Sequence, residues 1–270
     1  MSGHWIRFNK LLSDRRREVI VAVDHGEFLG PTEGIIDLPA AIHNAKEADG
    51  ILLSPGMIAH CGGVFDQRGA PLAILRLNWG TVYCDQWGYE QGRSAPVITP
   101  QEALRLGADL CLCSLTFTTK DEEQDAKNVE LFAHMASLKR DCGLPMIGEV
   151  FPCAVARLGA DELHSQIKTA CRIIVELGAD AIKTFYTGER FGEVCEAVPV
   201  PVFALGAEKL PQELDALKLA QNAVKAGARG VVFGRNVIQA KDPAAFLDGL
   251  KRVVKDEAEP EEVALELGLR

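Results

Sequence analysis

The chain has 270 residues, 47% of them hydrophobic, and a formal net charge of −9. This length is enough for one large core, and an acidic balance without any Lys/Arg run argues against nucleic acid or an anionic membrane as a partner. The sequence contains no long apolar span and no signal-peptide pattern, so a cytoplasmic protein without membrane association is expected.

Short, nearly continuous apolar runs recur along the chain and are typical of parallel strands covered on both faces. Eight of these runs are predicted to be strands, at residues 19–24, 50–54, 72–77, 109–115, 145–151, 180–185, 200–205 and 230–234. Helical patterns follow most of them, most clearly at 129–139, 162–177, 213–226 and 243–255. Eight strand–helix units in about 250 residues match the size of a (β/α)8 barrel.

Several predicted helices end in a glycine that is followed closely by the next strand. Gly107-Ala108-Asp109 and Gly178-Ala179-Asp180 are two examples, and Gly227 precedes the last strand in the same way. Glycine can adopt the left-handed conformation that closes a helix. We therefore predict a (β/α)8 TIM barrel at residues 1–255, followed by a short acidic C-terminal tail at 256–270 that contains a short helix. The alternative, a doubly wound sheet, usually shows a glycine-rich turn after its first strand, and that turn is absent here.

Lys183 interrupts the apolar run at 180–185. A lysine in a buried strand is costly because its ammonium group loses water, and burial favours the neutral amine. A neutral amine can attack a carbonyl and form a Schiff base. The other interpretation is a lysine that extends from the strand end to solvent.

Other polar residues fall at the carboxyl ends of the predicted strands, where barrel enzymes build their active sites. They come from four further strands, and a closed barrel would bring them around one mouth: Asp24, His25, Arg76, Asn78, Glu149 and Arg235. This convergence favours a catalytic Lys183. Structural alternatives remain, because Asp24 can serve as a cap and His25 can bond to the backbone.

Glu149 is expected to lie beside Lys183, because the two residues occupy neighbouring strands. Side chains alternate between the faces of a strand, so Glu149 shares its face with Phe151, and Lys183 shares its face with Phe185. A carboxylate there would stabilise the protonated amine or the iminium and could relay protons. The alternative for Glu149 is a structural ion pair with Arg76.

The last two strands end in small residues. Gly206 and Ala207 follow one strand, and Gly234 and Arg235 follow the next. Small residues let backbone N–H groups approach an anion, and Arg235 adds a positive charge. The loops after strands 7 and 8 are the usual phosphate site of this fold. A phosphorylated small-molecule substrate is therefore predicted.

Four segments together resemble the DhnA-type class I aldolases, the family of archaeal-type fructose-1,6-bisphosphate aldolases and of the thiolase that processes phosphorylated autoinducer-2. They are Val23-Asp24-His25-Gly26, the run from Asp180 to Gly188, the strand end at 205–206 with Lys209, and Val232-Phe233-Gly234-Arg235-Asn236. The resemblance covers most of the chain. It implies a Schiff-base Lys183 with Asp24 and His25 in the site, a phosphate held by Gly206, Ala207, Gly234 and Arg235, and a homo-oligomer, often a decamer.

Two segments are closer to the thiolase branch, at residues 24–34 and 199–211, and there the histidine equivalent to His25 works with the lysine. The chain departs from the bisphosphate aldolases, which carry W-x-Y-P-R where this sequence has Glu149-Val150-Phe151-Pro152-Cys153. Phe151 cannot transfer a proton, and Cys153 cannot clamp a phosphate as a guanidinium does. The sequence is therefore poorly suited to bind a substrate with two phosphate groups.

The preferred interpretation is a class I aldolase-type lyase or transferase for a monophosphorylated ketose-like substrate. Lys183 would form the iminium, Glu149 or His25 would move the proton, Asp24 would orient hydroxyls, and Arg76 would assist in binding. No cofactor and no metal are expected, because the iminium serves as the electron sink. The alternatives are fructose-1,6-bisphosphate cleavage, a thiolase acting on a phosphorylated dione, a non-catalytic phospho-sugar-binding barrel, and a metal-dependent lyase using His25, Glu149 and His60.

Overall fold

The computed structural model describes residues 2–12, 17–89 and 91–269. Eight parallel strands form a closed barrel in the order β1-β10-β9-β8-β7-β6-β3-β2. Their bounds are β1 Glu18–Ala22, β2 Gly50–Leu53, β3 Leu72–Arg76, β6 Leu110–Leu115, β7 Met146–Val150, β8 Ala181–Phe185, β9 Val202–Leu205 and β10 Gly230–Phe233. The prediction of a (β/α)8 TIM barrel is confirmed.

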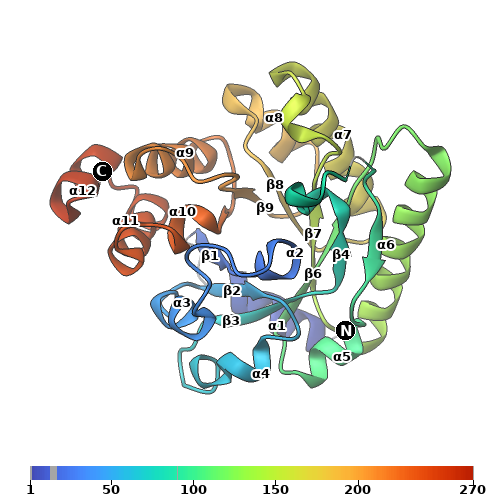
Figure 1. The fold of residues 1–270 in the computed structure, drawn as a ribbon, viewed down its shortest axis with the longest axis horizontal. Coiled ribbons are helices and arrows are strands. Elements are labelled where there is room, and N and C mark those ends of the chain that lie inside the picture. The colour runs from blue at the N-terminus through green and yellow to red at the C-terminus, as the bar shows by residue number, and fades with distance from the viewer. Residues whose placement is uncertain (1, 13–16, 90, 270) are drawn as a thin grey trace.

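Most helices surround the barrel as a ring, as Figure 1 shows, whereas α1 and α2 lie over its two ends. The helices of the described residues are α1 Ser2–Leu12, α2 Gly26–Leu29, α3 Leu38–Asn44, α4 Ile58–Cys61, α5 Pro100–Arg105, α6 Glu122–Cys142, α7 Ala160–Glu176, α8 Phe191–Glu196, α9 Glu213–Lys225, α10 Arg235–Ile238, α11 Pro243–Lys255 and α12 Pro260–Leu267. Short 3₁₀ turns lie at Gly62–Val64, Thr81–Tyr83, Asp85–Trp87, Val155–Arg157 and Gly188–Arg190. Of the helices that the structure describes, none has the length and apolar character to cross a membrane.

The glycines that follow three of the helices have the backbone conformation expected from the sequence. Gly107, Gly178 and Gly227 have φ angles of 98°, 116° and 105°. An L-residue with a Cβ atom is strained at such angles, so glycine allows each helix to end and the next strand to begin within a few residues.

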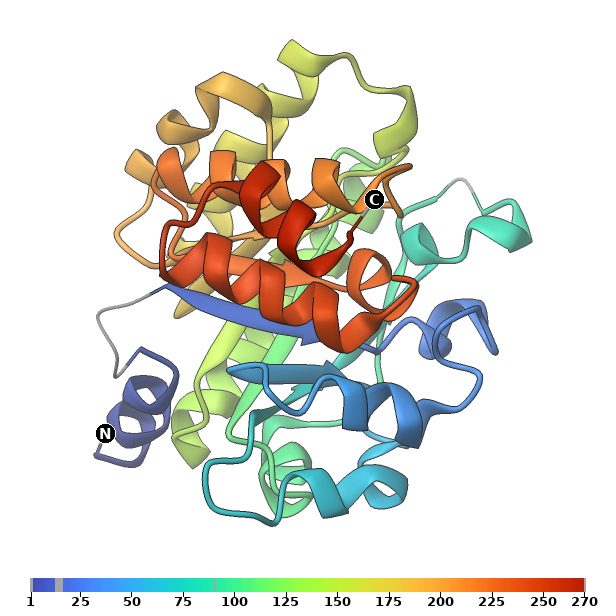
Figure 2. The ribbon, with the colours of Figure 1, turned by 90° about the vertical axis from the view of Figure 1, so that its left-hand side faces the viewer.

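The apolar residues divide into two layers because side chains alternate along each strand. The larger layer fills the space between the strands and the helices. The smaller layer lies inside the barrel and includes Ile20, Ile74, Ile147, Phe203 and Val232 together with Phe8 and Leu11 of α1. Helix α1 therefore closes the barrel at the end where the strands begin, which is visible in Figure 2.

The opposite end is covered by two additions to the strand–helix repeat. Helix α2 follows β1 directly, and a two-stranded antiparallel sheet forms between β4 (Asn78–Gly80) and β5 (Ser94–Pro96) after β3. In Figure 2 both lie at the end where the arrowhead of β1 points. The side chains of Asp24, Arg76, Glu149 and Lys183 lie toward this end.

The segment after residue 255 contains α12, which packs against α9 and α11. Val263 and Ala264 of α12 are buried, whereas Leu265 faces outward and is exposed. The expected acidic tail therefore begins with charged residues but continues as a helix that adds to the outer layer.

Candidate active site

One pocket lies at the carboxyl ends of the barrel strands. It is lined by nine residues that the sequence analysis singled out: Asp24, His25, Arg76, Glu149, Lys183, Gly206, Ala207, Gly234 and Arg235. Asn78, which was expected at the same mouth, is not part of the lining and instead bonds to the backbone of Ser114. The rest of the lining is largely apolar and includes Ala22, Phe28, Leu29, Phe151, Leu205 and Val232. The strand ends therefore bring these residues together, and their roles stay predictions.

Lys183 and Glu149 are direct neighbours across the β7–β8 ladder, where their Cα atoms are register partners. Glu149 is 1% exposed and Lys183 is 7% exposed. The Lys183 Nζ atom lies 2.5 Å from Glu149 Oε1. Lys183 therefore does not extend to solvent. Its ammonium or amine group is held inside the barrel mouth by a buried carboxylate.

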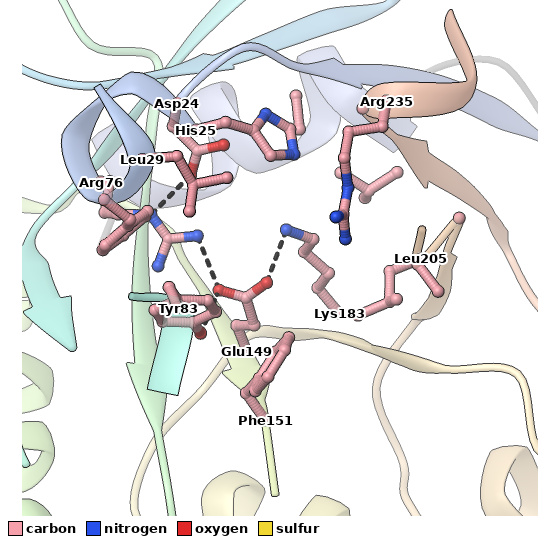
Figure 3. Close-up of a pocket in the computed structure, with 16 residues that line it drawn as sticks. Asp24, His25, Leu29, Arg76, Tyr83, Glu149, Phe151, Lys183, Leu205 and Arg235 are labelled. Atoms are coloured by element: carbon pink, nitrogen blue, oxygen red, sulfur yellow. Dashed lines mark hydrogen bonds and ion pairs between the residues drawn. The ribbon is translucent and has the colours of Figure 1, made fainter. Parts of the chain in front are cut away.

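Arg76 joins the two carboxylates of the site, as Figure 3 shows. Its Nε donates to Asp24 Oδ2 at 2.5 Å, and its Nη2 donates to Glu149 Oε2 at 2.7 Å. Both contacts expected for Glu149 are therefore present, because one oxygen pairs with Arg76 and the other with Lys183. The four side chains form one continuous charged network.

The charges of this network keep its carboxyl groups ionised. Burial alone would raise the pKa of Glu149, but the positive charges of Arg76 and Lys183 outweigh it and lower that pKa to about 2. For Asp24 the balance has the same sign, since burial is outweighed by Arg76 and Lys183 and its pKa is lowered. Both Glu149 and Asp24 are therefore carboxylates near neutral pH.

His25 packs edge-on against Gly234. A Cβ atom at position 234 would lie 2.3 Å from His25 Cε1, so glycine is required for the ring to occupy this place. Burial, assisted by the charges of Lys183 and Arg235, lowers the pKa of His25 to about 4 despite the opposing charge of Asp24. The imidazole is therefore neutral near pH 7, and its Nδ1 finds no hydrogen-bond partner within the described chain.

Asn236 organises the two loops that were predicted to hold phosphate. Its Nδ2 donates to the Gly206 and Glu208 carbonyls at 2.8 and 3.0 Å, and its Oδ1 accepts from the Leu210 N–H at 2.9 Å. These bonds fix the loop after β9, in which Ala207 adopts a φ of 52° despite its Cβ atom. Sequence reasoning missed Asn236 as the residue that ties the two loops together.

Arg235 begins α10 and projects into the pocket. Figure 3 shows its guanidinium group on the same side of the cavity as Lys183. The Nε atom is buried and has no hydrogen-bond partner among the residues that the structure describes. Arg235 therefore adds positive charge to a pocket whose other charges are balanced.

Tyr83 is a pocket residue that the sequence analysis did not identify. It ends the 3₁₀ turn Thr81–Tyr83, directly after β4, and its hydroxyl donates to Glu149 Oε2 at 2.9 Å. Its ring contacts Phe28 and Phe151, with centroid separations of 4.5 and 4.6 Å. The only sequence signal was an aromatic-rich stretch that follows Arg76.

His60 does not join this site. It lies on α4, is exposed and is not part of the pocket lining. Within the described ranges, no three His, Cys, Asp or Glu side chains are grouped so that they could hold a metal ion. The ligand set His25, Glu149 and His60 is therefore not assembled.

A buried lysine–carboxylate pair in the mouth of a (β/α)8 barrel is the arrangement that the sequence analysis expected of an aldolase-type barrel. The chain matches the model of the DeoC/LacD family aldolases over residues 18–240. It therefore belongs to the DeoC/LacD aldolase family.

Two relatives and one solved structure illustrate the similarity. The 2-amino-3,7-dideoxy-D-threo-hept-6-ulosonate synthase of Halobacterium salinarum is 30% identical, over 99% of this chain and 97% of the relative. The 3-hydroxy-5-phosphonooxypentane-2,4-dione thiolase of Yersinia enterocolitica is also 30% identical, over 88% of this chain and 77% of the relative. An archaeal fructose-1,6-bisphosphate aldolase, solved with its catalytic lysine bound to the carbinolamine intermediate of its substrate, superposes with a TM-score of 0.78 at 26% identity, covering 93% and 99%.

Proposed function

We propose that the protein is a class I aldolase in which Lys183 forms a Schiff base with a ketone, and that it cleaves or forms a C–C bond in a phosphorylated ketose-like substrate. The observation that carries the proposal is the contact of 2.5 Å between Lys183 Nζ and the buried Glu149 carboxylate inside the barrel mouth. The carbinolamine on the catalytic lysine of the archaeal aldolase supports the same chemistry.

The pair of Lys183 and Glu149 can carry out the first half of the reaction. Glu149 accepts a proton from the Lys183 ammonium group, and the neutral amine adds to the ketone carbon. The resulting carbinolamine loses water and leaves an iminium. When the β-hydroxyl of the substrate loses its proton, the C–C bonding electrons move toward the iminium nitrogen, an aldehyde departs and an enamine remains. The iminium supplies the electron sink that a metal would otherwise provide.

The second part of the proposal concerns the binding of the substrate phosphate. Asp24 and Glu149 balance Arg76 and Lys183, so the positive charge of Arg235 is in excess within the pocket lining. A substrate phosphate placed against Arg235 and the backbone at Gly206, Ala207 and Gly234 would neutralise that charge. The bonds from Asn236 hold the loop after β9 in a fixed position before the ligand arrives.

The other side of the pocket favours a substrate with a single phosphate. Phe28, Leu29 and Phe151 form an apolar wall, and the cations of the described lining are Arg76, Lys183 and Arg235. Arg76 is already engaged by two carboxylates. A second phosphate would therefore lack a cation of its own, which favours a monophosphorylated ketose over fructose 1,6-bisphosphate.

A thiolase outcome is the second candidate, favoured by the Yersinia enterocolitica relative. The same lysine would form its iminium with a phosphorylated dione. An acyl group would then be transferred to a thiol acceptor, whereas an aldolase would release an aldehyde. Identification of the products from a monophosphorylated ketose and from a phosphorylated dione separates the two outcomes.

The proposal is tested by borohydride reduction in the presence of phosphorylated ketoses, followed by peptide mass mapping. We expect a stable adduct on Lys183 in the parent chain and in Lys168→Met, whose substitution changes a partly exposed lysine of α7. Lys183→Met should lose both the adduct and turnover. An unmodified Lys183 across mono- and bisphosphorylated ketoses and diones, or ligand binding without turnover in the parent chain, would overturn the proposal in favour of a non-catalytic barrel.

A further inference from the structure

The phenol of Tyr83 is a proton carrier in the pocket that the mechanism above does not use. Its hydroxyl donates to Glu149 Oε2 at 2.9 Å, while Glu149 Oε1 lies 2.5 Å from Lys183 Nζ. One carboxylate thus connects the tyrosine with the lysine. Tyr83 also lines the cavity in which a ligand would contact Lys183, and its hydroxyl is bonded to the carboxylate that contacts this lysine.

The position of this hydroxyl is fixed by packing on several sides. The Tyr83 ring contacts the rings of Phe28 and Phe151, and the Phe151 ring continues to Phe185 at 5.0 Å. The guanidinium carbon of Arg76 lies 5.0 Å from the centroid of the Tyr83 ring. A ring held by aromatic and cation–π contacts keeps its hydroxyl in one orientation, which a proton-transfer residue requires.

Near neutral pH, Tyr83 differs from the neighbouring carboxyl groups and from His25 because its side chain carries a proton that it can donate. Glu149 has a pKa of about 2, and the pKa of Asp24 is also lowered, so both are carboxylates. His25 is neutral, with a pKa of about 4. Burial and the negative charge of Glu149 raise the pKa of Tyr83 well above its usual range, so the phenol keeps its proton.

We propose that Tyr83 is a catalytic residue of the C–C bond-forming and bond-breaking step, passing a proton between the substrate hydroxyl and Glu149. In cleavage, the substrate hydroxyl gives its proton to the Tyr83 oxygen while Tyr83 gives its own proton to Glu149 Oε2. The C–C electron pair moves to the iminium, which becomes an enamine. In synthesis the steps run in reverse: Glu149 accepts a proton from the substrate α-carbon when the enamine forms, Tyr83 protonates the aldehyde oxygen as the new C–C bond forms, and Glu149 returns its proton to Tyr83. The inference rests on the proposed function.

The test is Tyr83→Phe, which removes the hydroxyl and keeps the ring between Phe28 and Phe151. We expect kcat to fall about 10²–10⁴-fold, the range for loss of a general acid–base group. The borohydride adduct on Lys183 should form as in the parent chain, because iminium formation uses Lys183 and Glu149. Tyr89→Phe is the matched control, since Tyr89 is 53% exposed and outside the pocket lining. It should keep the parental kcat.

Each result has a distinct meaning. A kcat of Tyr83→Phe within about threefold of the parent would overturn the inference, as would an equal loss of adduct and turnover, because Tyr83 would then only hold Glu149 in place. Circular dichroism and thermal unfolding check that the variant is folded. If the parent chain itself forms no adduct, it is the proposed function that fails. If Tyr83→Phe forms the adduct and keeps its turnover, the inference about Tyr83 fails, whereas the proposed function stands.

Discussion

The two ends of the barrel use acidic residues in different ways. At the end closed by α1, three aspartates each accept a backbone N–H at the start of a neighbouring strand and each pair with a lysine from a helix. Asp49, Asp109 and Asp180 accept from Val19, Ala73 and Met146, and they pair with Lys255, Lys10 and Lys139, respectively. At the open end, Asp24 and Glu149 share one arginine, and Glu149 also contacts Lys183.

Under the proposed function, this difference separates a structural use of charge from a catalytic one. Each aspartate at the closed end has a backbone donor and a cation of its own, so it fixes the beginning of a strand. The carboxylates at the open end pair with side chains only, and those partners can change when a ligand or a proton arrives. Buried charge without fixed backbone partners is costly to maintain, and such networks are concentrated at active sites.

The largest effect should come from replacing one carboxylate at each end by its amide. Glu149→Gln should lower kcat about 10²–10³-fold, because the amide cannot accept a proton from Lys183. Asp180→Asn should leave kcat within about twofold of the parent but lower the unfolding free energy by about 1–3 kcal/mol, because the buried Lys139 loses its counter-charge.

Steady-state kinetics and urea unfolding of the two variants provide this comparison. The distinction between the ends fails if Asp180→Asn loses as much activity as Glu149→Gln at a temperature at which both variants are folded.

Two glycines at opposite ends of β10 sharpen the same comparison. A Cβ atom at Gly230 would lie 2.0 Å from the Glu18 backbone carbonyl oxygen, whereas at Gly234 it would meet the ring of His25. Gly230→Ala should therefore destabilise the fold by about 1–3 kcal/mol, since a paired backbone cannot move aside. Gly234→Ala should displace the His25 ring and weaken substrate binding, with a rise in KM of about tenfold.

Thermal unfolding and kinetics of the two alanine variants test this assignment. It would be contradicted by a Gly234→Ala protein with parental KM and kcat, or by a Gly230→Ala protein of parental stability.

The last prediction concerns the pH dependence of the unfolding free energy. The pKa of His25 is about 4 in the folded chain, below its ordinary value of 6.5, chiefly because of burial. Below pH 6.5 the unfolded chain takes up this proton first, so stability should fall as the pH decreases from about 6.5 to about 4. His25→Gln should reduce this fall. Urea unfolding at pH 7.0, 5.5 and 4.5 measures it, and equal pH dependence in both proteins would show that His25 does not contribute.

Local patterns in the sequence predicted the features that depend on regular geometry. The apolar runs located the strands, and the glycines at 107, 178 and 227 located helix ends because a positive φ requires that residue type. Strand alternation placed Glu149 beside Lys183, and the ladder pairs these two residues. The sequence suggested only an ion pair between Arg76 and Glu149, as an alternative, and not the position of Arg76 between Asp24 and Glu149. Strand alternation predicts the face on which a side chain lies, but it does not predict the rotamer.

The residues that the sequence analysis missed come from segments outside the repeat. Tyr83 reaches the pocket through the excursion between β3 and α5, whose path depends on the β4–β5 pairing and on ring contacts with Phe28. The strand and helix periodicities of the sequence do not predict the path of such an excursion. Asn236 acts through bonds to a loop that is distant in sequence, so its position next to Arg235 gave no indication that it holds Gly206.

The most direct test of the account is a crystal structure of the protein soaked with a monophosphorylated ketose and reduced with borohydride. We predict continuous density from Lys183 Nζ to the ligand, with Glu149 still within hydrogen-bond distance of the reacting atoms and the phosphate against Arg235. A ligand in the pocket that leaves the contact between Lys183 and Glu149 intact, without a covalent bond, would contradict the claim that this pair is the reactive centre.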